Sequence, residues 1–163
     1  MHPRHLAALR LAAAGVPVIP IRAPYIHKHA LNEHGKCTVC AGFKVPVIRW
    51  QQERSKDSEQ INRWWAVDNY NLAIVPADVG MTVIDLDGAA GAAGWAKLCA
   101  DLGMDPGDPP MVRTPGGGLH LYYSGPTFRP SAGVLGMGID VRSEDSYVLV
   151  PPSEIGGREY HWL

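Results

Sequence analysis

Apolar positions in the first third of the chain change between helical and extended spacing. Leu6, Leu9 and Ala13 form a helical stripe near the N-terminus. The stretch "VPVIPI" that follows has the composition of a strand, and its two prolines favour an edge position. After a second extended piece, "FKVPVIRW", the stretch "SKDSEQINRWW" predicts a helix with Asp57 or Ser58 as its N-cap.

Strand patterns dominate the rest of the chain. "NLAIVP" and "MTVIDLD" are typical of buried strands, and "ADVG" between them predicts a hairpin turn. "AAGAAGWAKLCADLG" predicts an Ala-rich helix weakened by its glycines. "PPMVRTPGGGLHLYYS" and "MGIDVRSEDSYVLVPPS" each predict strand, turn, strand. We therefore expect an α+β fold with mixed or antiparallel sheets and flanking helices.

Composition and charge narrow the class of protein. The 163 residues predict one domain, spanning 1–163, and the formal net charge of −1 argues against a free-standing, charge-driven DNA binder. A local basic groove stays possible. No apolar run approaches the roughly 20 residues that a membrane span needs. The three cysteines favour a reducing cytoplasm. The ending "REYHWL" suggests a domain cut from a longer protein.

Two carboxylates interrupt the strand "VIDLDG". Side chains alternate along a strand, so Asp85 and Asp87 are expected on one side, with Ile84 and Leu86 turned into the core. Two like charges repel unless a cation lies between them, and Mg²⁺ or Mn²⁺ is the natural partner. The alternative is that both acids cap turns at the strand end.

A third acid, Asp140, has a similar apolar context in "GIDVRS". Three acids from two strands could hold two divalent ions, the arrangement used for displacement at phosphorus. Arg142 should share the strand face of Asp140. It could pair with that acid or bind a nucleotide phosphate, and both readings stay open.

The stretch "TPGGGLHLYY" contributes a histidine and glycines. His120 interrupts an apolar strand and needs a polar partner, for which a triphosphate is one candidate. Gly117 and Gly118 would allow close backbone approach and offer N–H groups to phosphate. The alternative is a satisfied core histidine beside an ordinary hairpin turn.

Taken in order, these motifs resemble a known family. D-x-D after a strand, G-G-x-H, and h-D-V-R leading into "SYVLVPPS" follow an opening with "GVPVIP", a K-x-P made by Lys44 and Pro46, "WW" and "NLAIV". This order resembles the prim-pol type of the archaeo-eukaryotic primase superfamily, the N-terminal domain of bifunctional DNA primase/polymerases of phages, plasmids and mobile elements. The resemblance covers almost the whole chain.

The resemblance implies a catalytic core related to the RNA-recognition (RRM) fold, with an added N-terminal part. It implies that Asp85, Asp87 and Asp140 bind two Mg²⁺ or Mn²⁺ ions and that His120 contacts the incoming triphosphate. Arg142 would assist, and Lys44 is a candidate contact for phosphate or template. The implied activity is template-directed primer synthesis and extension from NTPs or dNTPs on single-stranded DNA. A C-terminal helicase or ATPase domain of the same protein is the expected partner.

One segment departs from the family pattern. The insertion at 22–43 is rich in His and Cys, and its residues have the spacing of a structural zinc site, with Cys37, Cys40 and His34 as ligands and His29 or His27 as the fourth. The alternative is a flexible loop with free thiols.

Two rival functions use the same residues. A non-catalytic replication module would bind nucleotide or single-stranded DNA without making product. A two-metal nuclease would use the same acids but would have no need of a triphosphate contact at His120.

Overall fold

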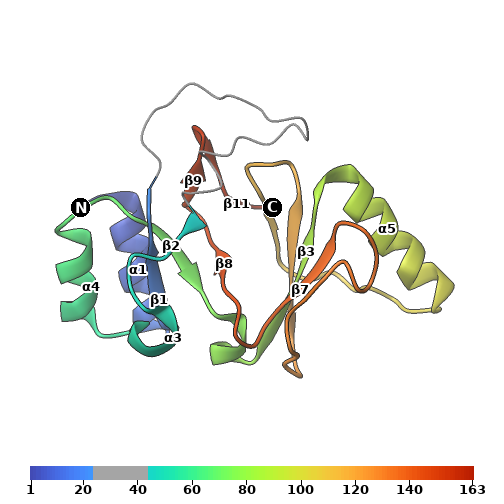
Figure 1. The fold of residues 1–163 in the computed structure, drawn as a ribbon, viewed down its shortest axis with the longest axis horizontal. Coiled ribbons are helices and arrows are strands. Elements are labelled where there is room, and N and C mark those ends of the chain that lie inside the picture. Colours follow the sequence, from blue (N-terminus) through green and yellow to red (C-terminus); the bar gives the residue numbers. More distant parts are fainter. Residues whose placement is uncertain (24–43) are drawn as a thin grey trace. The chain divides into compact units, whose positions relative to one another are not determined.

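The computed structural model describes residues 1–23 and 44–163 (Figure 1). These residues form two compact units, one made of Met1–Ile74 and Leu149–Tyr160, the other of Val75–Val148 and His161–Leu163. Helices combine with antiparallel sheets, which confirms the predicted α+β class. None of the helices in the described ranges is both long and apolar enough to cross a bilayer.

The first unit joins the N-terminal elements to a late segment of the chain. Its three-stranded sheet has the order β1-β2-β8, and a separate hairpin pairs β9 with β10. The elements are α1 (Pro3–Ala13), β1 (Val18–Ile21), α3 (Trp50–Glu53), α4 (Ser58–Trp65), β2 (Asn71–Ile74), β8 (Val148–Leu149, at the boundary between the units), β9 (Glu154–Ile155) and β10 (Arg158–Glu159). Strand β1 lies at the edge of its sheet, as its prolines predict.

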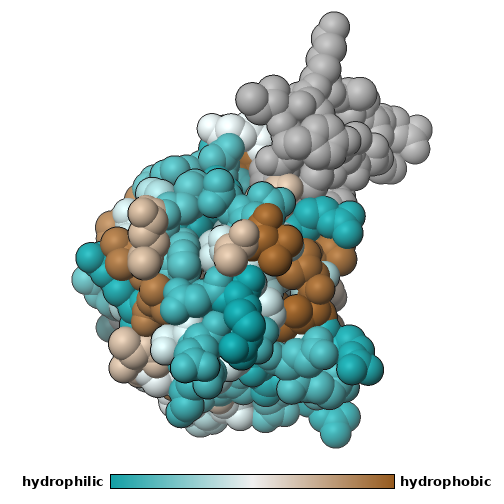
Figure 2. All heavy atoms as spheres, turned by 90° about the vertical axis from the view of Figure 1, so that its left-hand side faces the viewer, coloured by the Kyte–Doolittle hydropathy of each residue, from teal (hydrophilic) through white to brown (hydrophobic). Residues whose placement is uncertain are grey.

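Helix α4 forms where the capping signal places it. The Asp57 carboxylate accepts a hydrogen bond of 2.9 Å from the backbone N–H of Gln60, which confirms Asp57 as the N-cap. The helix buries Ile61 and Trp65 and leaves polar side chains outside. The face drawn in Figure 2 is largely hydrophilic, with several separate apolar areas.

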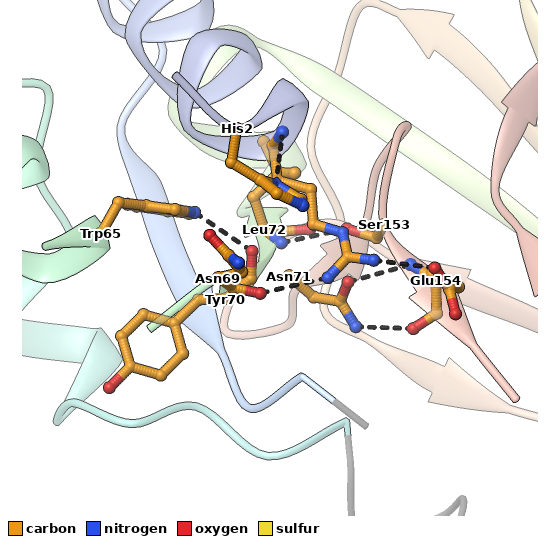
Figure 3. A network of polar contacts seen from close by, with 9 residues as sticks. His2, Trp65, Asn69, Tyr70, Asn71, Leu72, Ser153 and Glu154 are labelled. Carbon is orange, nitrogen blue, oxygen red and sulfur yellow. Dashed lines mark hydrogen bonds and ion pairs between the residues drawn. The ribbon is translucent and has the colours of Figure 1, made fainter. Parts of the chain in front are cut away.

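A polar network attaches the late segment to the N-terminal elements (Figure 3). The side chain of buried Asn71 donates to the backbone carbonyl of Glu154 at 2.7 Å and accepts from its N–H at 2.9 Å. The Ser153 hydroxyl bonds both backbone groups of Leu72, each at 2.9 Å. Arg4 of α1 adds an ion pair of 2.9 Å to the Glu154 carboxylate. The bonds of Asn71 and Ser153 thus connect the backbone of the late segment with that of β2.

The second unit is a six-stranded antiparallel sheet with the order β11-β4-β5-β3-β7-β6. Strand β3 therefore lies between β5 and β7. The elements are η2 (a short 3₁₀ helix, Pro76–Val79), β3 (Met81–Leu86), α5 (Gly88–Asp101), β4 (Met111–Arg113), β5 (Leu119–Ser124), β6 (Ser131–Ala132), β7 (Ile139–Arg142) and β11 (His161–Trp162).

The two faces of this sheet differ in chemistry. One face forms an apolar cluster against which Ala92 and Trp95 of α5 pack; its buried members are Ile84, Leu86, Leu121, Ile139 and Val141. Because side chains alternate along each strand, the intervening residues project from the opposite face. That opposite face carries Asp85, His120, Asp140 and Arg142, whereas α5 packs on the apolar face.

One of the predicted connections is wrong. "ADVG" forms part of the 3₁₀ helix η2 rather than a hairpin turn, and β2 and β3, which flank it, belong to different sheets. Strands β7 and β8 exist as predicted, but β7 pairs with β3 and β6 whereas β8 pairs with β2. The hairpin between β4 and β5 is confirmed. The ring of Pro76 fixes the φ angle of that residue in the helical range, which favours a helical turn over a hairpin.

Candidate active site

The site is centred on Asp85, because β3 is paired on both sides at this residue. In the β3–β5 ladder Asp85 lies opposite His120, and in the β3–β7 ladder it lies opposite Asp140. Residues directly opposite in antiparallel strands share a face, with Cβ atoms about 4.5–5.5 Å apart. The register therefore gathers three titratable side chains from three adjacent strands on the face that α5 leaves uncovered.

Short polar contacts join these side chains. His120 Nε2 lies 3.5 Å from Asp85 Oδ1, and the Arg142 guanidinium reaches both acids, with Nε at 3.7 Å from Asp85 Oδ2 and Nη2 at 2.6 Å from Asp140 Oδ2. Arg142 extends from the same face of β7 as Asp140, two residues away, as strand alternation predicts. The Arg142 guanidinium therefore contacts two carboxylates.

The site is partly shielded from water. The His120 side chain is 6% exposed, the Asp85 side chain 21% and the Asp140 side chain 19%. Coulomb interactions are stronger in a partly buried site than at an open surface. The attraction between Arg142 and the two carboxylates is therefore stronger than that of a fully exposed ion pair.

Asp140 is held from its second oxygen as well. Its Oδ1 accepts a hydrogen bond of 2.9 Å from the backbone N–H of Gly133, at the start of the loop between β6 and β7. The charge of Arg142 also acts on Tyr147. Burial raises the pKa of the Tyr147 hydroxyl, and the positive guanidinium opposes that rise.

Asp87 occupies a different position from the other two acids. It is the N-cap of α5, exposed, with an extended backbone, and its carboxylate makes no capping bond to the helix. Its backbone N–H donates to the carbonyl of Gly138 at 2.8 Å. The structure thus pairs Asp85 with Asp140 and shows no such pairing for Asp87, whose metal-binding role stays a prediction.

Gly117 and Gly118 form the tight turn between β4 and β5. The N–H of Gly117 donates to the Thr114 carbonyl at 2.9 Å, and the N–H of Gly118 donates to the Thr114 hydroxyl at 3.1 Å. A Cβ atom at Gly118 would lie 2.3 Å from the carbonyl oxygen of Leu86. The close backbone approach expected of these glycines therefore occurs within the protein itself, and their contact to phosphate stays a prediction.

The remaining candidate residues belong to the first unit or fall outside the described residues. Lys44 is exposed and belongs to the first unit, so its role as a phosphate or template contact stays a prediction. The proposed zinc ligands fall outside the described residues; they are Cys37, Cys40, His34 and His29, with His27 as the alternative fourth.

The donor set of Asp85 and Asp140 suits a divalent ion that is completed by its substrate. Within residues 1–23 and 44–163, no group of three or more His, Cys, Asp or Glu side chains could hold a metal ion by itself. Mg²⁺ is commonly bound by one or two carboxylates, with water and substrate phosphates supplying the other oxygens. Two opposed carboxylates on one sheet face fit that kind of site.

Sequence reasoning missed the contacts that come from distant segments. Nothing in "SAGVLGMGID" signals that the N–H of Gly133 would bind the Asp140 carboxylate, because the bond depends on how the loop closes. The proximity of Tyr147 to Arg142 was missed for the same reason. The pairing of Arg142 with Asp140 was one of two readings left open, and the structure contains it.

Comparison with known families agrees with the resemblance drawn from the motifs. The family model for Prim-Pol, described as the N-terminal domain of bifunctional DNA primase/polymerases, matches residues 8–163. No curated protein matches the chain. The matched range includes every residue of the site described above.

Proposed function

The chain belongs to the Prim-Pol family of bifunctional DNA primase/polymerase N-terminal domains, and on that premise we propose that it catalyses template-directed nucleotidyl transfer. The substrates are NTPs or dNTPs, the acceptor is a 3′-hydroxyl, and the template is single-stranded DNA. The observation that carries the proposal is the register of β3, which sets Asp85 against Asp140 on one side and against His120 on the other.

Each of these side chains has a task in such a reaction. Asp85 and Asp140 offer opposed oxygens to Mg²⁺ or Mn²⁺, and Asp87 is the proposed third ligand. When bound, two such ions would activate the 3′-hydroxyl and offset negative charge on the transferred phosphate. His120, 3.5 Å from Asp85, orients that carboxylate and is the proposed triphosphate contact. Arg142 supplies a planar guanidinium suited to bidentate phosphate binding.

Removal of one carboxylate charge should strongly reduce the rate of nucleotide incorporation. Asp85→Asn and Asp140→Asn keep the side-chain shape but lose the charge that binds a divalent ion. Loss of partners outside the metal's own ligand shell already costs about 10–100-fold, so we expect losses of roughly 100-fold or more for these variants. The measurement is incorporation of labelled nucleotide on a primed single-stranded template with Mn²⁺.

The matched control is Asp108→Asn. Asp108 is exposed in the same unit and lies outside the site, so this variant should incorporate nucleotide at the wild-type rate. Circular dichroism would show that all three variants are folded. Full incorporation by Asp85→Asn would remove the two-metal proposal. Nucleotide binding without product by the wild-type chain on any template would favour the non-catalytic replication module.

A further inference from the structure

Arg142 contacts both Asp85 and Asp140, the two carboxylates proposed to bind a divalent ion. Its Nη2 lies 2.6 Å from Asp140 Oδ2, and its Nε lies 3.7 Å from Asp85 Oδ2. A guanidinium keeps its charge at any physiological pH. As long as Arg142 contacts the two acids, it therefore neutralises one of their two negative charges.

This arrangement opposes binding of a free divalent ion. A cation that reached both carboxylate oxygens would lie next to the guanidinium, and two positive charges a few ångströms apart repel strongly in a partly shielded site. The ion must therefore displace Arg142 from at least one acid. The contact to Asp85 is the longer of the two, and the Arg142 side chain is 34% exposed, so the guanidinium has room to turn away.

We infer that Arg142 is an internal counter-ion that couples divalent-ion binding to nucleotide binding. The inference rests on the proposed function and extends it. An incoming triphosphate offers the guanidinium new oxygen partners, so Arg142 leaves Asp85 and Asp140, and the carboxylates become available to the ion. By linkage, nucleotide strengthens ion binding and the ion strengthens nucleotide binding by the same factor. Arg142 thus has two alternative sets of partners, the two acids and the triphosphate.

The test measures Mn²⁺ affinity by titration calorimetry, with and without a non-hydrolysable dNTP. Couplings of this kind usually amount to about 5–150-fold, so wild-type protein should bind Mn²⁺ at least about fivefold more tightly when nucleotide is present. Arg142→Gln should bind Mn²⁺ more tightly than wild type without nucleotide. The gain on adding nucleotide should be smaller in Arg142→Gln than in wild type, because the competing cation is gone and only the oxygens that the nucleotide itself offers to the ion still couple the two ligands.

Two further variants separate this role from a general change in charge. Arg129→Gln removes a charge from an exposed position in the same unit and should leave both affinities and their coupling as in wild type. Arg142→Lys keeps the charge but lacks the planar fork that reaches two acids, so its coupling should fall between wild type and Arg142→Gln. This variant also serves as the test if Arg142→Gln does not fold.

The inference is overturned if Arg142→Gln and wild type show the same Mn²⁺ affinity without nucleotide, or if Arg129→Gln strengthens Mn²⁺ binding equally. Failure of the proposed function looks different. In that case wild-type protein would bind no Mn²⁺ even with nucleotide present, or Asp85→Asn and Asp140→Asn would leave Mn²⁺ binding unchanged.

Discussion

At the scale of single residues, charge and hydrogen-bonding capacity decide which side chains can lie close together. The register of β3 and β7 places Asp85 opposite Asp140, and Arg142 lies against both carboxylates, where its charge offsets their repulsion. Hydrogen-bonding capacity also decides the start of α1, where the imidazole of His2 is the N-cap in place of the usual serine or aspartate. The Nδ1 atom of His2 accepts a hydrogen bond of 3.3 Å from the backbone N–H of Arg4.

This cap should make the stability of the protein depend on pH. Burial lowers the pKa of His2, and the Arg4 charge lowers it further, so the folded state favours the neutral ring that can accept the bond. Because the pKa of His2 is lower in the folded state than in the unfolded state, the neutral ring stabilises the fold. This contribution is fully present above the pKa of the unfolded chain, near 6.5, and is lost as the pH falls through the pKa of the folded state. Urea unfolding of wild type should therefore show a loss of stability as the pH falls below the unfolded value of 6.5.

The comparison variant for this prediction is His2→Asn. Asparagine caps helices well but does not titrate in this range, so the difference in unfolding free energy between His2→Asn and wild type should grow as the pH falls. A difference that stays constant across the range would contradict a titrating cap.

At the scale of elements, the junction of β3, α5 and β7 sets the geometry of the site. Gly91, in the first turns of α5, lies against the backbone of Gly138, just before β7. The carbonyl of Gly138 in turn accepts from the N–H of Asp87. The helix can approach the loop this closely only because Gly91 has no side chain.

Gly91→Ala should therefore destabilise the protein. Its Cβ atom would lie 2.4 Å from the Gly138 carbonyl oxygen, which forces a backbone shift and costs about 1–3 kcal/mol. Gly94→Ala is the matched control on the same helix. Its Cβ atom would meet only the Ile139 side chain at 3.5 Å, so the better helix propensity of alanine should stabilise the protein by up to about 1 kcal/mol.

Chemical denaturation of both variants measures these effects. Equal stability of the two would mean that the contact between Gly91 and the Gly138 backbone does not constrain the fold.

At the scale of the whole molecule, residues distant in sequence complete the first unit. The segment Leu149–Tyr160 belongs with Met1–Ile74, and buried Asn71 binds both backbone groups of Glu154 in that segment. A chain that ended before this segment would leave the Asn71 amide, which is 0% exposed, without the partners it now has.

Asn71→Ala should weaken this attachment. The substitution leaves the N–H and the carbonyl of Glu154 without their partner, and each unsatisfied buried group costs about 1–3 kcal/mol. We expect a total loss of roughly 2–4 kcal/mol in the unfolding free energy, measured by urea denaturation. Asn69→Ala, at an exposed position nearby, should change stability by less than about 0.5 kcal/mol. Equal losses for the two variants would show that the network does not stabilise the unit.

The sequence alone determined the features that depend on a few neighbouring residues. Spacing and capping within short windows explain four features: the helix capped by Asp57, the edge position of β1, the strand around Asp85, and the shared face of Asp140 and Arg142. The order of the motifs was sufficient to identify the family.

Only the tertiary structure decided which strands are neighbours, because strand pairing joins residues far apart in the chain. The pattern around "ADVG" could not reveal that β2 and β3 enter different sheets, since both flanking stretches are equally apolar. For the same reason, the local pattern could not place Asp85 opposite both His120 and Asp140, nor show one guanidinium reaching two acids. Alternation fixes the face on which a side chain lies, but the side chain opposite it is fixed by the register of the assembled sheet.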